Sequence, residues 1–449
     1  RAAEPSSARV NGSRSIETDT LRVAVGDDDK VSIELLSVGA GKTSSVHFSD
    51  VLQLVDVADA GDEYDFAPIV GDIELRATLV GARATMAGPG VAQLLLTHEL
   101  ALPVALNDDR SARSAQFTVH RLETLLRVAG DQPFVECVTR FTNEACDHRL
   151  RVRVALNGRA THTLGDGHFA MVERPIALPV PETKWKQEPV PSQYCESAAV
   201  LPSFDGSRGV AVFTRGLHEY EAVGLLHDGA VNVNAANADE HALDVTLVRS
   251  IGWLSREDIP DRPGHAGPAL ATPDAQCLGE HAVEFAIAPF AGSWEGAAVA
   301  SNARRFAAPP VLLPKIPHEH RNHSGQQARE LDIAVEVAHG GASRGFPTAG
   351  IELHGLELSA VKPAEDGSGD VIVRGFNAGR TPVDVELVLR MPFTQVRRCQ
   401  LDEQPLVGVQ ATPGEHGAAD AVGPSVPATF VVRAQSRAGE ILSWRVTPA

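Results

Sequence analysis

The chain has 449 residues, of which 43% are hydrophobic and 22% charged, and a formal net charge of −18. These values are typical of a soluble globular protein, and the length predicts two or three domains. No run of about 18 apolar residues indicates a membrane span, and 58 acidic against 40 basic residues leave no basic surface for a polyphosphate. We therefore expect neither a membrane nor a nucleic acid as a partner.

The five cysteines are scattered along the chain and never form a CxxC pair: Cys137, Cys146, Cys195, Cys277 and Cys399. Their odd number and spacing argue against a disulfide framework and against a thiolate zinc site. A reducing compartment fits this pattern best, so we expect a cytoplasmic protein.

Apolar residues alternate with polar ones over most of the chain, which predicts a mainly β protein. Turn residues separate the short predicted strands, as in a large antiparallel sandwich. The clearest predicted strands cover residues 21–25, 31–36, 73–80, 91–100, 209–214, 242–248 and 282–287.

Two neighbouring strands, 134–141 and 150–156, are separated by a turn-like segment and are predicted to form a hairpin. Apolar residues of each strand share one face. The same alternation predicts that Arg149, Arg151 and Arg153 point outward.

One helix is expected over residues 294–306, with Ser293 as its N-cap, followed by a Pro- and His-rich segment at 309–345. Further short strands follow over about a hundred residues, the size of an immunoglobulin-like sandwich, with a mobile loop at 408–427. The predicted organisation is a flexible lead-in (1–15), a large β-sandwich (16–290), a connector (291–345) and a small β-sandwich (346–449).

A first cluster of polar residues lies at 61–65, where three carboxylates surround Tyr64. Carboxylates such as Asp62 accept hydrogen bonds from vicinal diols, and a tyrosine offers both an apolar ring face and a hydroxyl. The cluster is a candidate sugar-binding loop. An acidic, solvated turn is the alternative.

A second cluster contains Arg249, Asp258, Arg262 and His265 in a loop stiffened by proline and glycine. Stiff loops of this kind present binding groups, although arginines that pair with local carboxylates would serve structure alone. The His-rich segment 318–323 (HEHRNH) lacks the HExxH spacing, and we expect no metal site there.

Residues 248–281, VRSIGWLSREDIPDRPGHAGPALATPDAQCLGEH, together with AGDEYDFAP at 60–68, resemble the C-terminal β-rich region of bacterial α-mannosidases of glycoside hydrolase family 38. Weaker similarity covers residues 16–23, 209–221 and 392–406. The resemblance implies a large antiparallel galactose-mutarotase-like super-sandwich followed by a smaller immunoglobulin-like β-sandwich.

The resemblance also implies what the chain does not contain. Family 38 enzymes hold zinc through His and Asp ligands in an N-terminal catalytic domain, which also supplies an aspartate nucleophile for retaining hydrolysis of α-mannosides. None of the 17 histidines is followed two residues later by aspartate, as that metal motif requires. We expect zinc in the full-length family member, no cofactor and no catalytic residue in this chain, and no turnover by this chain alone.

The expected role is to dock on the N-terminal catalytic domain of the same polypeptide and complete the rim of its site for mannose-containing glycans. The rim or interdomain candidates are Asp62, Tyr64, Arg249, Arg262 and His265. A stand-alone carbohydrate-binding module, or a mutarotase-like epimerase that uses His and Glu as acid and base, is the alternative. The sequence leaves open a homo-oligomer.

Overall fold

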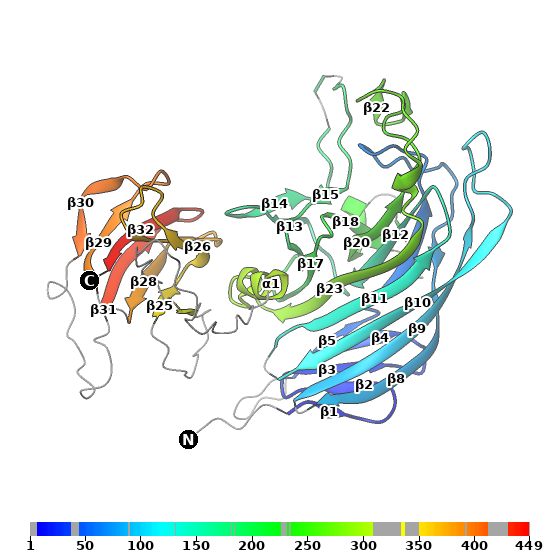
Figure 1. Cartoon of the computed structure of the whole chain (residues 1–449). Helices are drawn as coiled ribbons and strands as arrows, with labels where there is room; N and C mark the ends of the chain where they lie inside the picture. The colour runs from blue at the N-terminus through cyan, green and yellow to red at the C-terminus, as the bar shows by residue number, and fades with distance from the viewer. Residues whose placement is uncertain are drawn as a thin grey trace, which may run out of the picture. The chain divides into compact units, whose positions relative to one another are not determined.

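The computed structural model describes residues 7–36, 45–88, 90–130, 132–180, 182–183, 185–225, 231–232, 235–308, 334–336, 350–390, 393–411 and 430–448 (Figure 1). The chain divides into two compact units: residues 1–166 with 172–307 form unit 1, and residues 167–171 with 308–449 form unit 2. The predicted domain boundaries at 290 and 345 stay a prediction. The HEHRNH segment lies outside the described residues, as does most of the predicted loop at 408–427.

Unit 1 begins with a five-stranded antiparallel meander. Its strands are β1 (Arg9–Val10), β2 (Ser15–Glu17), β3 (Leu21–Val25), β4 (Val31–Leu35) and β5 (Val46–Ser49). The first two strands fall largely within the predicted lead-in. They are held there because Arg9 pairs with Glu17 across β1 and β2, at 3.0 Å, and with Asp19.

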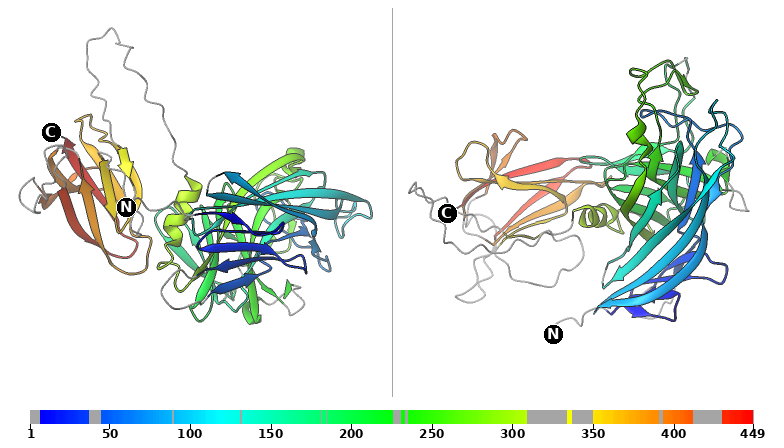
Figure 2. Two further views of the ribbon diagram at one scale, coloured as in Figure 1. Left: turned by 90° about the horizontal axis from the view of Figure 1, so that it is seen from below. Right: turned by 45° about the vertical axis from the view of Figure 1, so that its right-hand side comes forward.

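A nine-stranded antiparallel sheet follows, with the order β14-β13-β16-β17-β23-β11-β10-β9-β8. Its strands are β8 (Thr78–Gly88), β9 (Val91–Pro103), β10 (Phe117–Ala129), β11 (Val135–Asn143), β13 (His162–Asp166), β14 (Met171–Pro175), β16 (Ala198–Pro202), β17 (Arg208–Arg215) and β23 (Gly279–Ala291). The long strands β8 to β11 form one curved layer (Figures 1 and 2).

A seven-stranded sheet completes the large sandwich, with the order β15-β18-β20-β12-β6-β7 and with β19 paired to β18. Its strands are β6 (Gln53–Ala58), β7 (Leu75–Arg76), β12 (His148–Ala155), β15 (Gln193–Tyr194), β18 (Glu219–Leu225), β19 (Val231–Asn232) and β20 (Glu240–Ser250). The short pair β21 (Asp258–Ile259) and β22 (Arg262–Pro263) lies in the loop after β20, beyond the ends of the sheet strands (Figure 1).

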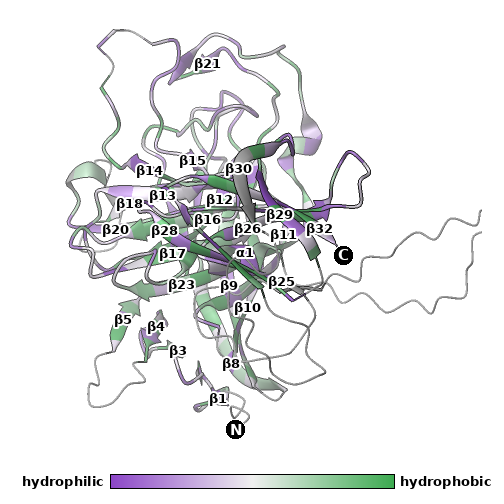
Figure 3. Cartoon of the chain, turned by 90° about the vertical axis from the view of Figure 1, so that its left-hand side faces the viewer, coloured by the Kyte–Doolittle hydropathy of each residue, from purple (hydrophilic) through white to green (hydrophobic). Residues whose placement is uncertain are grey.

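One apolar core joins the three sheets of unit 1, from Leu21 and Ile33 in the meander to Leu96, Val152 and Phe285. Inward and outward residues alternate along the strands, so green and purple segments recur side by side in the sheets (Figure 3). The predicted fold class, mainly β with a large antiparallel sandwich before a smaller one, is confirmed.

Unit 2 is a sandwich of two sheets around the buried Trp444, Val373 and Leu387. Within the described residues, one sheet contains β24 (Ala334–Glu336), β25 (Gly350–His354), β28 (Val383–Leu389) and β31 (Phe430–Ser436). The other contains β26 (Glu357–Pro363), β27 (Val371–Phe376), β29 (Phe393–Cys399), β30 (Pro405–Ala411) and β32 (Ile441–Pro448). All pairs are antiparallel except β24 with β25.

The predicted helix is shorter than the sequence indicates. Helix α1 covers Val299–Ala307, and two short 3-10 helices lie at Ala235–Asn237 and Pro273–Gln276. Ser293 caps a separate turn by accepting a hydrogen bond from the Gly296 N–H, at 3.1 Å. Ala298 then adopts φ 52°, which interrupts the helical geometry before α1 begins. No helix in the described part of the chain is long and apolar enough to cross a membrane.

The predicted hairpin of residues 134–141 and 150–156 is wrong. Strand β11 pairs with β10 and β23 in the nine-stranded sheet, whereas β12 pairs with β6 and β20 in the seven-stranded sheet. Both strands do present an apolar face, but the two faces meet across the core. Alternation identifies a buried face without identifying the strand that pairs beside it.

Arg149, Arg151 and Arg153 do point away from the core, as predicted, but all three side chains are buried and do not reach solvent. They lie on the face of β12 opposite the core and form ion pairs with Asp244 of β20 and with Glu221 of β18. Glu74 and Glu219 complete the cluster. Burial opposes the charge of Asp244, but Arg153 and Arg151 outweigh burial and lower the pKa of that carboxyl.

We expect the unfolding free energy to decrease by about 2 kcal/mol between pH 7 and pH 5 through His98 alone. This side chain is buried in β9, and burial lowers its pKa from 6.5 to about 4. The unfolded chain therefore binds a proton at His98 in this pH range, whereas the folded chain does not. The stabilising contribution of neutral His98 is fully present above pH 6.5 and is lost as the pH falls toward 4. Urea denaturation of the wild type and of His98→Gln at both pH values measures the difference. An equal pH dependence in the two proteins would contradict the assignment.

Candidate functional site

The two polar clusters of the sequence meet at one end of the seven-stranded sheet. Strands β6 and β20 flank β12, and His148 of β12 lies opposite Ala58 on one side and Ser250 on the other. Since both flanking strands are antiparallel to β12, they run in the same direction and end side by side. The chain segments that leave them, which we name the Asp62 loop (residues 59–68) and the Arg262 loop (residues 251–276), therefore start as neighbours.

Asp62 is the centre of the contact between these loops, and its side chain is fully buried. One carboxylate oxygen accepts hydrogen bonds from the backbone N–H groups of Tyr64, at 3.0 Å, and Asp65, at 2.9 Å. The other accepts from the Arg256 backbone N–H, at 2.8 Å, and from the Arg262 guanidinium. Burial works against ionisation, but the hydrogen bonds from Arg262 and the backbone prevail and lower the pKa of Asp62.

The two predicted arginines are also used within the protein. Arg262 is almost fully buried and forms ion pairs with both Asp62 and Asp65. Arg249, which belongs to β20 itself, pairs with the buried Asp59, at 2.6 Å, and donates to the backbone carbonyl of Asp65, also at 2.6 Å. Both guanidinium groups therefore hold the Asp62 loop in its conformation through these contacts.

Tyr64 and His265 are the predicted site residues that reach the surface. The Tyr64 side chain is 54% exposed, and the Arg262 guanidinium lies 5.8 Å from its ring centroid. A Cβ atom added at Gly267 would come within 2.9 Å of the Tyr64 hydroxyl, so the phenol lies against the Arg262 loop and would have to shift to admit a larger residue there. His265 is partly exposed and lies 3.8 Å from Glu257.

The structure therefore brings the five predicted residues into one region and divides them by role. Asp62, Arg249 and Arg262 hold two loops in place, and Tyr64 and His265 face solvent above them. Sequence reasoning placed Asp65 in the acidic cluster without recognising it as an arginine partner, and it missed Asp59, the partner of Arg249. It also missed Arg149, which lies 3.9 Å from the centroid of the Phe66 ring and supports the Asp62 loop from the sheet.

The described residues of this region do not form a metal-binding site. Among the described residues, no group of three or more His, Cys, Asp or Glu side chains is arranged to hold a metal ion. The carboxylates of Asp59, Asp62 and Asp65 are already paired with arginines, so we assign zinc no ligand in the described part of the chain.

Comparison with known proteins finds a family match in unit 2. Residues 355–431, in unit 2, match the family model described as "Glycosyl hydrolases family 38 C-terminal beta sandwich domain". The chain carries the C-terminal β-rich region of glycoside hydrolase family 38. The family recognised from the sequence is confirmed, although the matched residues lie outside the two stretches, 248–281 and 60–68, that carried the resemblance.

The relatives of this family 38 region extend the match to unit 1. A protein of Halalkalibacterium halodurans named "Putative mannosylglycerate hydrolase" is 25% identical over 406 residues, which cover 87% of this chain and 38% of that protein. An α-mannosidase structure from Enterococcus faecalis V583 superposes with a TM-score of 0.67 at 22% identity, covering 99% of this chain and 42% of that one. A second family 38 structure from Enterococcus faecalis has the same TM-score, 21% identity and 45% coverage of its chain.

This family 38 region thus spans less than half the length of the relatives that it matches. The matched family domain is by its description C-terminal, so the additional part of those relatives precedes the matched region. The structural likeness shows a shared fold of both units, and the activity of the relatives is a separate question.

Arg262→Ala should destabilise unit 1 by about 3 kcal/mol, because the substitution leaves the buried carboxylate of Asp62 without its counter-ion. Arg256→Ala is the matched control: that guanidinium pairs with the exposed Asp258, and its loss should cost about 1 kcal/mol or less. Urea denaturation followed by circular dichroism gives both values. Equal effects of the two substitutions would show that the buried pair does not hold the loops together.

Proposed function

We propose that this chain is the non-catalytic part of a family 38 α-mannosidase and that it completes the rim of a catalytic domain supplied by the N-terminal part of the same polypeptide. The observation that carries the proposal is the exposed Tyr64, held on a loop whose buried charges are all paired and which belongs to a unit that shares its fold with a family 38 structure. The full-length polypeptide would hydrolyse terminal α-mannosides with retention, and zinc would be bound by its N-terminal part.

The Asp62 loop supports this role because it presents Tyr64 in a preorganised position. Four hydrogen bonds to the Asp62 carboxylate fix the turn before any ligand arrives, so little conformational entropy is lost when a sugar binds. A phenol can stack its ring on the apolar face of a mannose unit and exchange hydrogen bonds with the sugar hydroxyls. His265 would contribute a second polar group at the same surface.

The proposed compartment is the cytoplasm. All five cysteines are free, and Cys137, Cys195 and Cys399 are buried. Burial raises the pKa of the Cys195 thiol to about 12, so this side chain is a poor thiolate nucleophile and acts as a packed apolar group. Free thiols of this kind are typical of a reducing environment.

The 449-residue chain should not hydrolyse an aryl α-mannoside, with or without added zinc, whereas the full-length polypeptide should do so. The reason is that this chain contributes a rim and no nucleophile or acid. Release of the aryl alcohol, followed by absorbance, measures both proteins under the same conditions. Zinc-dependent hydrolysis by the 449-residue chain would contradict the proposal that the catalytic residues belong to the N-terminal part of the polypeptide. Heat of mannose binding to that chain, lost in Tyr64→Ala, would instead favour a stand-alone binding module.

Tyr64→Phe in the full-length polypeptide should lower kcat/KM for the aryl α-mannoside by about tenfold, the effect of one lost hydrogen bond to the reacting sugar. Tyr194→Phe is the control, because this exposed tyrosine bonds Glu196 and lies outside both loops. Thermal unfolding should be the same in both variants, since neither hydroxyl is buried. An unchanged kcat/KM for Tyr64→Phe would remove Tyr64 from the proposed rim.

A further inference from the structure

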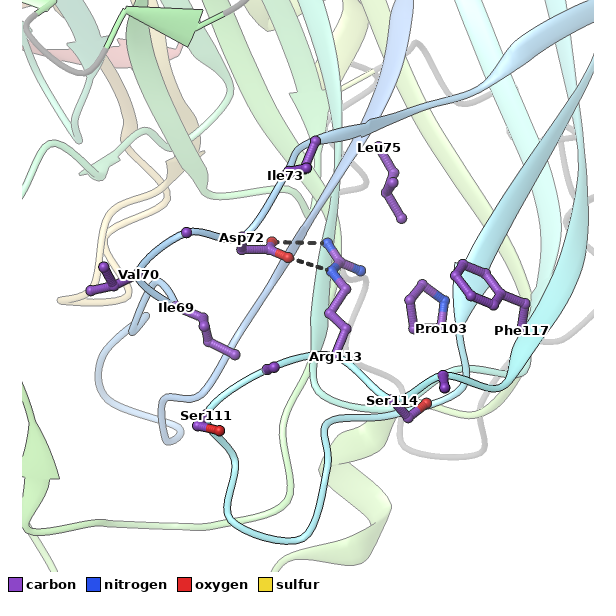
Figure 4. A pocket seen from close by; sticks show the side chains of 13 residues that line it. Ile69, Val70, Asp72, Ile73, Leu75, Pro103, Ser111, Arg113, Ser114 and Phe117 are labelled. Carbon is purple, nitrogen blue, oxygen red and sulfur yellow. Dashed lines mark hydrogen bonds and ion pairs between the residues drawn. The ribbon is translucent and has the colours of Figure 1, made fainter.

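An apolar pocket lies beside the chain segment that follows the Asp62 loop (Figure 4). Its volume is about 420 Å³, and its walls come from residues 69–75 on one side and from the ends of β9 and β10 with the loop between them on the other. The large apolar lining residues are Ile69, Val70, Ile73, Leu75, Pro103 and Phe117.

The walls of this pocket expose large apolar side chains to solvent. Val70 is fully exposed, Ile73 is 76% exposed and Phe117 is 61% exposed. Val119, the next outward residue of β10, continues the surface and is also exposed. Single exposed apolar residues are ordinary, but a contiguous group around a concavity is typical of a surface that another part of a protein covers.

The floor of the pocket is polar, but its charged side chains are already paired with each other and with Asp56. Arg113 forms a bidentate pair with Asp72, at 2.9 and 3.2 Å, and its third nitrogen contacts the buried Asp56 at 2.7 Å. Asp72 also accepts a hydrogen bond from the Ala58 backbone N–H, at 2.8 Å. These contacts hold both walls in place, and they leave an apolar group as the occupant that the pocket fits best.

One wall of the pocket and the candidate rim lie on the same connecting segment of the chain. Residues 59–74 connect β6 to β7, and Tyr64 lies on this connection together with Val70 and Ile73. The Asp62 loop closes on itself through the Ala60 N–H and the Ala67 carbonyl, at 2.9 Å, just before the pocket wall begins. A body that covers the pocket is therefore next to the loop that carries Tyr64.

We infer that this pocket is the docking site for the N-terminal part of the same polypeptide, which inserts apolar side chains between residues 69–75 and Phe117. The inference rests on the proposed function. Its occupant follows from the comparisons: the matched relatives are more than twice as long as the region they share with this chain, and their additional part precedes it. Docking there buries the exposed apolar walls and places the N-terminal part beside Tyr64.

Hydrogen–deuterium exchange on the 449-residue chain and on the full-length polypeptide tests the inference. We expect exchange in residues 69–75 and 111–119 to be at least about tenfold slower in the full-length polypeptide. The turn that contains Phe204 is the matched control, because this side chain is 68% exposed and lies outside the pocket. Its exchange should be the same in both proteins.

Substitutions provide the second measurement. Ile73→Asp and Phe117→Asp should leave the melting temperature of the 449-residue chain unchanged, because both side chains are exposed there. In the full-length polypeptide the same variants should lose the slow exchange at 69–75, whereas Phe204→Asp should retain it. A charged side chain in the pocket has no partner, since Arg113 is already paired.

Each outcome decides a different point. Unprotected walls in a full-length polypeptide that hydrolyses an aryl α-mannoside would overturn the docking site and leave the proposed function intact. Protected walls without hydrolysis would overturn the proposed activity alone. Protection that develops in the 449-residue chain as its concentration rises, with a dimer in sedimentation, would assign the pocket to a second copy and overturn the inference.

Discussion

The pairing of β12 with strands on both of its edges is the constraint on which the candidate site depends. His148 faces Ala58 of β6 and Ser250 of β20, so the loops after these strands start at the same end of the sheet although almost 200 residues separate them. The His148 ring reinforces the register, with one nitrogen 2.6 Å from the Asp56 carboxylate and the other 3.0 Å from the Asn143 amide oxygen. A shift of one residue would exchange the core face of β12 with its arginine face.

Ion pairs fix the positions of the loops, whereas apolar packing fixes the positions of the sheets. Arg249 and Arg262 pair with carboxylates of the Asp62 loop. Arg149, Arg151 and Arg153 pair with carboxylates of β18 and β20, on one side of β12, and with Glu74, just before β7 at the other side. Buried ion pairs add little net stability when they are compared with apolar packing, but each unpaired member would be costly. Such pairs therefore specify one arrangement of loops and strands among many compact ones. This is the requirement for a surface that presents Tyr64 at a defined position.

The same pairing of charges separates the two kinds of surface at this end of unit 1. Around Tyr64 and His265, aromatic and polar groups face solvent, as a carbohydrate surface requires. Around Val70, Ile73 and Phe117 the exposed groups are apolar and the nearby charges are neutralised, as a protein interface requires. Both surfaces include residues of the connection between β6 and β7, namely Tyr64 in one and Val70 and Ile73 in the other. A rim that contacts sugar and an interface that positions the rim would then be parts of one loop.

Local patterns of the sequence were sufficient for the β class, for most strand positions and for the family, because alternation and the unusual composition of residues 248–281 are local properties. They also located the five candidate residues. Only the tertiary structure decided which strands pair, that the arginines of β12 are buried, and that Asp62 and Arg262 hold each other while Tyr64 remains exposed. The physical reason is that a charge pattern along one strand looks the same whether its partners are water or carboxylates, and those carboxylates come from strands and loops distant in the chain.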